Sequence, residues 1–372
     1  MHVLMTADCV GGVWTYVREL ATGLVRRGVK ITLVSFGEIP TPDQTKWIDS
    51  FPGIEFHPTG FPLEWMHGVE ADLKASAEHL LDIIADTRPD LLHLNQYFYG
   101  AIDCGLPRVV VAHSDVLSWS EAVHGHEPAP SDWLEWYRSL VARGVASANC
   151  VVAPSQWMLS ALHRHYGDLA ENYQVIHNGR NPKLFNPYMT KEDYALSVGR
   201  LWDGGKQLKL LCQKKLPMDC YIAGSDRHPD ASLQAENSLR TTSHPQLRFL
   251  GALSEAQLSR TYGRASVYVA TSRYEPFGLA PLEAALSRCA LLMNDLPSFR
   301  ELWQDDVIYF EQNNPESLLA VLAQLKQDAG LRAEYAKRAY RRAQSQFTSD
   351  KMADSYLGLY ESVVQAHMPL AA

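Results

Sequence analysis

The sequence predicts an α/β protein in which two doubly wound parallel sheets follow one another along the chain. Short runs rich in β-branched residues alternate with segments whose apolar residues recur at the helical period, which is the pattern of βαβ units. A polar stretch with Gly179, Pro182 and Pro187 interrupts this alternation, and the alternation then restarts. We therefore place a domain boundary at this stretch.

The first half opens on a predicted strand that leads directly into a helix. Val3 to Met5 is short and apolar, and apolar residues recur at the helical period from Val13 to Leu24. This helix is expected to end near Gly28, because glycine commonly follows a helix terminus. Further strands are predicted at 30–35, 90–94, 108–112, 150–153 and 173–176, giving six or seven strands before residue 180.

The second half repeats the alternation and closes on an isolated helix. Strands are predicted at 194–198, 220–223, 247–250, 267–270, 290–293 and 307–310, with helices at 255–264 and 315–327. Thr348, Ser349 and Asp350 form a capping signal for a last helix that no strand follows. We expect this helix to return to the first domain, so the predicted domains are 1–182 plus 348–372 and 183–347.

Composition excludes several classes of protein. At 372 residues and 41.7 kDa the chain has room for two domains of ~150 residues or more. The formal net charge of -8 is opposite in sign to the broad basic surface of a nucleic-acid binder. The six cysteines contain no Cys-x-x-Cys pair, which favours reduced thiols in a cytoplasmic protein. We find neither a signal peptide nor the ~18 apolar residues of a membrane span.

Glycines follow the first strand of each half, where a parallel sheet binds its ligands. Gly11 and Gly12 could cradle a phosphate or a sugar, or simply form a tight turn. There is no Gly-x-Gly-x-x-Gly, which argues against a nicotinamide cofactor. In the second half, Gly199 to Lys206 lacks the spacing and the Ser/Thr of a phosphate-binding Walker A loop. Arg200 in this loop could still converge with Lys206 on a diphosphate, or both cations could be solvated.

Two further strand ends carry groups suited to chemistry. Thr271 to Glu283 leads from a strand through a Pro-Phe-Gly loop into a helix, with Glu275 in the loop and Glu283 about one turn into the helix. Backbone N–H groups at Phe277, Gly278 and Leu279 would face a bound anion. His113 follows an apolar strand, where it could bond a ligand hydroxyl or simply be satisfied by nearby backbone.

Taken together, these motifs resemble the retaining glycosyltransferase family 4, which has the GT-B fold. The resemblance covers nearly the whole chain. It rests on Gly11-Gly12, His113-Ser114, His177-Asn178-Gly179, Phe185-Asn186-Pro187, Gly199-Arg200 with Lys206, and Glu275 to Glu283 as a Glu-x7-Glu element. It implies two Rossmann-like domains that face a central cleft and close on each other, with the last helix crossing back to the N-terminal domain. It also implies transfer of a sugar from a UDP- or GDP-sugar with retention of anomeric configuration.

The resemblance implies a role for each candidate residue. Arg200 and Lys206 match the cations that neutralise the departing diphosphate, Glu283 matches the ribose ligand, and Glu275 sits where the family contacts the donor sugar. The implied catalytic residues are Glu275, His113, Arg200 and Lys206, and the implied donor-binding residues are Gly11, Gly12, Arg200, Lys206, Phe277, Gly278, Leu279 and Glu283. The segments 286–289 and 294–301 depart from the family pattern, which leaves the contacts to the donor sugar open.

Neither a metal nor another cofactor is expected. The sequence contains no Asp-x-Asp, and the two cations offer the charge that magnesium supplies in other transferases. His124-Gly125-His126-Glu127 could form a metal cluster, although its loop with two prolines disfavours this. The alternatives that remain open are a nucleotide-sugar 2-epimerase of the same architecture and a non-catalytic nucleotide-sugar-binding subunit.

The expected partners are a nucleotide-sugar donor and a saccharide, glycolipid or small-molecule acceptor, with no nucleic acid. Trp119, Trp133 and Trp136 are candidates to stack on an acceptor sugar, and core packing is the alternative for each. Basic residues between Arg332 and Arg342 would suit an anionic membrane surface, but a solvated helix face is favoured. The protein is expected to be a monomer or a homodimer that contributes to polysaccharide or glycoconjugate biosynthesis.

Overall fold

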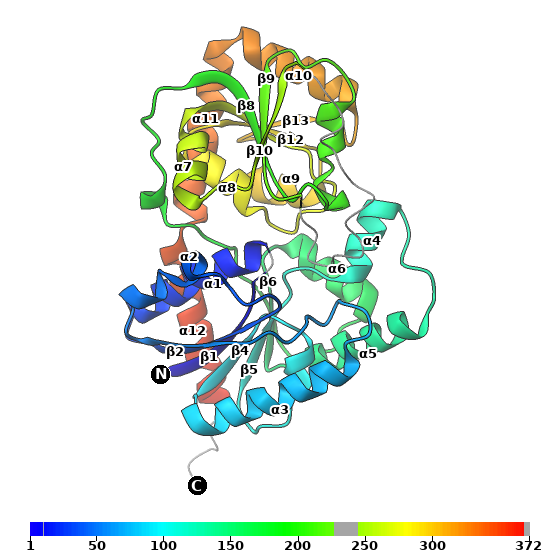
Figure 1. Ribbon diagram of the computed structural model, residues 1–372, viewed down its shortest axis with the longest axis vertical. Coiled ribbons are helices and arrows are strands. Elements are labelled where there is room, and N and C mark those ends of the chain that lie inside the picture. The colour runs from blue at the N-terminus through cyan, green and yellow to red at the C-terminus, as the bar shows by residue number, and fades with distance from the viewer. Residues whose placement is uncertain (10, 227–244, 368–372) are drawn as a thin grey trace. The chain divides into compact units, whose positions relative to one another are not determined.

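Each half of the chain builds one all-parallel β-sheet in the computed structural model, which describes residues 1–9, 11–226 and 245–367 (Figure 1). One unit comprises Met1–Glu121, His126–Gly179 and the described residues from Ser349 on. The other comprises Arg180–Thr348 together with Ala122–Gly125. The prediction of two Rossmann-like units with parallel sheets is confirmed.

The sheet of the first unit has seven strands in the order β3-β2-β1-β4-β5-β6-β7. Their bounds are β1 His2–Asp8, β2 Lys30–Phe36, β3 Ile54–Pro58, β4 Leu91–Leu94, β5 Arg108–Val111, β6 Cys150–Ala153 and β7 Tyr173–Val175. Six of them lie where strands were predicted. The strand β3 was missed because it is an edge strand whose residues are mostly only partly buried or exposed, so it lacks a continuous apolar run.

Helices cover both faces of this sheet. They are α1 Gly12–Val25, α2 Pro42–Thr45, α3 Glu70–Thr87, α4 Val116–His124, α5 Asp132–Ala146, α6 Gln156–Tyr166 and α12 Ser349–His367, with the 3-10 turns η1 Ile48–Ser50 and η2 Phe98–Ala101. Successive strand residues point to opposite faces. Leu4 therefore joins a core with residues of α3 and α5, and Val3 joins another core with residues of α1 and α12.

The closing helix α12 packs against α1, as predicted for the last segment of the chain (Figure 1). The two helices approach closely at Gly23, where an added Cβ would lie 2.7 Å from the Cβ of Ala353. Arg27 Nε lies 2.6 Å from an Asp354 carboxylate oxygen, and the Tyr360 hydroxyl lies 2.7 Å from Nδ1 of the buried His93 in β4. Both a polar and an apolar contact thus hold the helix on the first unit.

The second unit has six strands in the order β10-β9-β8-β11-β12-β13. The strands are β8 Glu192–Val198, β9 Asp219–Ala223, β10 Leu247–Gly251, β11 Ala265–Ala270, β12 Ala290–Asn294 and β13 Ile308–Phe310. The helices are α7 Glu255–Arg264, α8 Leu279–Leu286, α9 Pro297–Trp303, α10 Pro315–Gln327 and α11 Ala329–Gln346, and the turns are η3 Pro182–Leu184, η4 Gly204–Lys206 and η5 Leu208–Cys212. The strand order reverses between β8 and β11, so the loops that leave these strands emerge side by side.

Two further features bear on the expectations from sequence. All six cysteines are free thiols. Of the helices in the described ranges, none combines the length and the apolar character needed to cross a bilayer.

Glycine allows η2 to lie directly against α5 in the first unit. A Cβ on Gly144 would collide with the Tyr97 carbonyl oxygen, so Gly144→Ala should lower the free energy of unfolding by ~1–3 kcal/mol. The control is Gly358→Ala in α12, where nothing lies within 4 Å of an added Cβ. Alanine there should raise stability by ~0.5–1 kcal/mol through helix propensity. Urea unfolding of both variants measures this contrast, and equal effects would contradict the packing.

Candidate functional site

Two neighbouring strands of the second unit, β8 and β11, deliver the residues of the candidate site. The loop after β8 runs from Gly199 to Lys206, and the loop after β11 begins at Thr271. Hydrogen bonds join the two loops: the Arg273 N–H donates to the Gly205 carbonyl at 2.9 Å, and the Thr271 hydroxyl donates to the Lys206 carbonyl at 2.8 Å. The loop after β11 therefore fixes the backbone of the loop after β8 at Gly205 and Lys206.

Lys206 and Glu275 form an ion pair at the meeting point of these loops. The Lys206 ammonium lies 2.6 Å from Glu275 Oε2, and the two side chains are only 19% and 14% exposed. The Ser272 hydroxyl donates to the same oxygen at 3.1 Å. The stem of Lys206 passes over Gly199, where an added Cβ would come within 3.1 Å of it. Two predicted catalytic residues are thus brought into contact.

Arg200 is held by a carboxylate that the sequence analysis did not single out. Its guanidinium donates to Asp203 at 2.6 Å and lies over the Trp202 ring at 5.0 Å. Asp203 also accepts from the Gly205 N–H at 2.8 Å, which caps η4. Burial by itself would raise the pKa of the Asp203 carboxyl, but Arg200 and Lys206 outweigh it and hold that pKa below its ordinary value.

The loop after β11 ends in the N-terminus of α8. Gly278 precedes the helix with a φ of 91°, a left-handed conformation that favours glycine, and no side chain caps the helix. Phe277 is buried and packs edge-on against Phe347 with ring centroids 5.4 Å apart. Only the backbone of Phe277 can therefore serve a ligand, together with the N–H groups of Gly278 and Leu279.

Glu283 in α8 forms a buried ion pair with Arg180. The Arg180 Nε lies 2.9 Å from Glu283 Oε1, and the two side chains are 3% and 10% exposed. Arg180 also lies 3.3 Å from a Glu255 oxygen and over the Phe185 ring at 5.3 Å. The sequence analysis missed Arg180. The sequence holds one signal for this residue, an arginine directly after His177-Asn178-Gly179 in the segment that connects the two halves. A cation that becomes buried needs an acidic partner.

The other candidates belong to the first unit. Gly11 has a φ of 79°, a left-handed conformation that favours glycine, and directly precedes α1, which begins at Gly12. The role of these two glycines in donor binding stays a prediction. His113 follows β5 and is partly buried. Its Nε2 lies 2.7 Å from the Asn95 amide oxygen, and burial lowers the pKa of its imidazole to about 3, so the ring is neutral.

The candidate acceptor aromatics also lie in the first unit. Trp119, Trp133 and Trp136 are all partly buried. The Trp133 ring stacks on Tyr137 at 5.5 Å and packs on His67 at 4.1 Å, and its indole N–H donates to the Met66 carbonyl at 3.2 Å. Packing within the unit therefore already uses much of Trp133.

The remaining charged candidates have mostly protein partners. In the described part of the chain no three His, Cys, Asp or Glu side chains gather closely enough to hold a metal ion, and Glu127 instead pairs with Arg138 and His165. In α11, Arg338 and Arg342 lie 3.5 and 3.4 Å from Asp306. These two arginines are therefore paired within the second unit, and the choice between a solvated face and a membrane contact stays a prediction.

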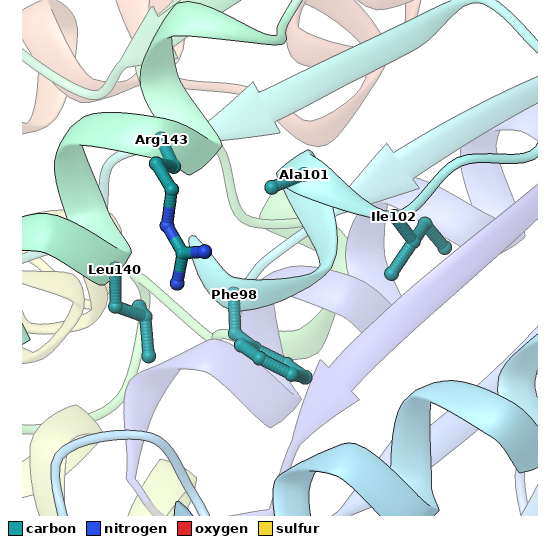
Figure 2. Close-up of a pocket in the computed structure, with 5 residues that line it drawn as sticks. All are labelled: Phe98, Ala101, Ile102, Leu140 and Arg143. Carbon is teal, nitrogen blue, oxygen red and sulfur yellow. The ribbon is translucent and has the colours of Figure 1, made fainter.

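A separate pocket of about 120 Å³ lies between η2 and α5. It is lined by Phe98, Ala101, Ile102, Leu140 and Arg143, and Figure 2 shows Arg143 extending from α5 toward Phe98. None of these residues belongs to the candidate site.

Substitution of Asp203 tests how much its contacts with Arg200 and the Gly205 N–H stabilise the loop after β8. Because its folded-state pKa is depressed, its contribution to stability is fully present above the unfolded pKa of about 4 and is lost as the pH falls through the folded value. Asp203→Asn should therefore lower the free energy of unfolding at pH 7 by ~1.5–3 kcal/mol, the range for hydrogen bonds to charged groups. Denaturant unfolding from pH 7 to pH 3 measures this. A deficit that stays constant with pH would contradict the assignment.

The buried pair of Arg180 and Glu283 gives a second stability test. Arg180→Met leaves a buried carboxylate without its cation, which should cost ~3–5 kcal/mol. The double variant Arg180→Met, Glu283→Leu should recover most of this loss, because the uncompensated charge is gone. Urea unfolding of Arg180→Met, Glu283→Leu and the double variant completes a double-mutant cycle. If the losses of the two single variants simply add up in the double variant, the pair is not coupled.

The chain matches two family models that follow one another. Residues 10–184 match the model described as Glycosyltransferase Family 4, and residues 188–342 match Glycosyl transferases group 1. The O-antigen chain mannosyltransferase RfbU of Salmonella typhimurium is 24% identical over 196 residues, which are 52% of this chain and 55% of the relative. A GDP-mannose:cellobiosyl-diphosphopolyprenol alpha-mannosyltransferase of Komagataeibacter xylinus is 26% identical over 248 residues, 63% of this chain and 62% of the relative.

These matches thus span little more than half the length of the two relatives. The likeness to solved structures extends over the whole chain. Sucrose-phosphate synthase from Thermosynechococcus elongatus shares the fold with a TM-score of 0.80 at 19% identity, over 98% of this chain and 100% of that chain. The two family models together account for most of the sequence, and the chain belongs to glycosyltransferase family 4, the group 1 transferase enzymes with the GT-B fold.

Proposed function

We propose that this protein transfers a sugar from a nucleoside diphosphate sugar to an acceptor, with retention of anomeric configuration. The observation that carries the proposal is the position of Lys206, Arg200 and the N-terminus of α8. All three leave the carboxyl ends of β8 and β11, where the strand order of the second sheet reverses. A diphosphate is the ligand whose charge suits two cations and a helix N-terminus.

The proposed chemistry places positive charge where negative charge develops. As the bond between the anomeric carbon and the diphosphate oxygen breaks, the leaving diphosphate gains negative charge. Lys206 and Arg200 would stabilise it, and fixed charges of this kind often provide the largest part of the rate enhancement. The Lys206 ammonium must then exchange its contact with Glu275 for one with phosphate. Glu275 would be released toward the donor sugar, and Glu283 would bind the ribose.

The proposal requires neither a metal nor another cofactor, because the two cations supply the charge that a metal supplies in other transferases. A phosphate oxygen of the donor would take the proton from the acceptor hydroxyl. We also propose a cytoplasmic location, a compartment in which free thiols such as these six cysteines stay reduced.

The names of the relatives guide the choice of donor. Two of them are named mannosyltransferases, and one name specifies GDP-mannose. We therefore propose GDP-mannose as the first donor to test, with a glycoconjugate such as a lipid-linked saccharide as the acceptor. A thermal-shift screen across GDP- and UDP-sugars identifies the donor, because a ligand that binds only the folded state raises the melting temperature.

Variants of the ion pair test the catalytic assignment. Lys206→Ala should lower the rate of transfer by about 10²–10³-fold, the effect of removing one group that stabilises developing charge. Glu275→Ala should lower it by about 10²-fold or more, because the carboxylate that would contact and orient the donor sugar is removed. Lys209→Ala is the matched control, because Lys209 lies in the same segment but is exposed. It should transfer at the wild-type rate. Full activity in both Lys206→Ala and Glu275→Ala would overturn the assignment.

Product analysis separates this function from its alternatives. A transferase releases nucleoside diphosphate in proportion to glycosylated acceptor. A 2-epimerase would change the free donor without any acceptor, and a binding subunit would bind the donor without hydrolysis or transfer. Either of these results with the donor found in the screen would contradict sugar transfer.

A further inference from the structure

The amide of Asn95, just after β4 in the first unit, has only one orientation that satisfies its neighbours. Its Nδ2 donates to the Thr6 carbonyl oxygen at 2.6 Å, and its backbone N–H donates to the Thr6 hydroxyl at 2.9 Å. A carbonyl oxygen only accepts hydrogen bonds, so the amide nitrogen must be the atom that faces Thr6. The amide oxygen Oδ1 is consequently directed toward His113.

This orientation determines which nitrogen of His113 carries a proton. His113 Nε2 lies 2.7 Å from Asn95 Oδ1, and an amide oxygen can only accept, so the proton must reside on Nε2. Burial keeps the imidazole neutral, with its pKa lowered to about 3. Nδ1 is then an unprotonated acceptor, and no hydrogen bond within the described residues reaches it.

The ring of His113 is also held from the side. Tyr16 packs edge-on against it with centroids 4.6 Å apart, and the Tyr16 hydroxyl lies 3.2 Å from His93 Nε2. His93 is fully buried, and its other nitrogen lies 2.7 Å from the Tyr360 hydroxyl. Tyr16 is thus anchored to the core, which limits rotation of the His113 ring. The partial exposure of His113 leaves it within reach of a ligand.

We propose that Asn95 is a positioning residue that fixes His113 as a hydrogen-bond acceptor through Nδ1. The ligand group that meets His113 must then be a hydrogen-bond donor, and a sugar hydroxyl is such a group. The identity of the ligand rests on the proposed function, whereas the tautomer of His113 does not.

Nitrogen NMR of the free protein tests the tautomer directly. The chain has 14 histidines, so the His113 signals are assigned by their loss in His113→Gln. With ¹⁵N-labelled histidine at pH 7, we expect a protonated Nε2 and an unprotonated Nδ1. A proton on Nδ1, or an imidazolium, would overturn the proposal whatever ligand the protein binds.

Two variants test the role of Asn95. In Asn95→Asp the carboxylate should stabilise the imidazolium, so both nitrogens of His113 should carry protons at pH 7. In Asn95→Ala the loss of Oδ1 should give a mixture of the two neutral tautomers. Circular dichroism verifies that each variant is folded. An unchanged His113 spectrum in whichever of them folds would show that Asn95 does not fix the tautomer.

Fluorinated donors test the consequence for binding. Fluorine cannot donate a hydrogen bond, so replacing the hydroxyl that meets His113 should weaken binding to the wild type by about tenfold, the effect of one hydrogen bond. In Asn95→Asp the same replacement should change the affinity by no more than about twofold. Equal affinity of the wild type for every monofluorinated analogue would overturn the ligand part of the proposal. Failure of every nucleoside diphosphate sugar to bind would instead contradict the proposed function and leave the NMR result standing.

Discussion

The ion pair between Lys206 and Glu275 joins two loops that leave neighbouring strands of the second sheet. Its atoms are 2.6 Å apart and mostly shielded from water, and both loops are also tied through their backbones. The pair keeps the ammonium in a defined place without a ligand. It also sets the condition for catalysis, because an anionic ligand must compete with a carboxylate for Lys206. In the proposed reaction the diphosphate displaces Glu275 from Lys206, because the diphosphate carries two negative charges and the carboxylate carries one.

The charged groups around the site are likewise each held by an oppositely charged partner. Asp203 holds Arg200 and closes the turn at Gly205, while Arg180 holds Glu283 and reaches Glu255 in α7. Buried charges are costly unless they are paired, so these contacts fix the geometry of the second unit before any ligand arrives. In the first unit Asn95 holds His113 in a similar way, but through a neutral hydrogen bond and not an ion pair.

Local patterns were sufficient to predict most of the elements, including α7 and α10 with their observed bounds. The edge strand β3 escaped because partial burial removes the apolar run on which such predictions depend. The candidate cations and glutamates could be selected from motif spacing and resemblance. Their partners could not, because the contacts of Arg180 with Glu283 and of Lys206 with Glu275 exist only once strands distant in sequence lie side by side. Asn95 likewise carries no signal until the β4 and β5 ends are adjacent.

The proposed reaction depends most on the exchange of the Lys206 ammonium from the Glu275 carboxylate to a phosphate. Calorimetric titration of the wild type and of Glu275→Gln with GDP and with UDP measures it without any sugar transfer. We expect one of these nucleotides to bind the wild type, and to bind Glu275→Gln at least as tightly, because the neutral amide no longer competes for the ammonium. A folded Glu275→Gln protein that no longer binds the nucleotide would contradict the exchange.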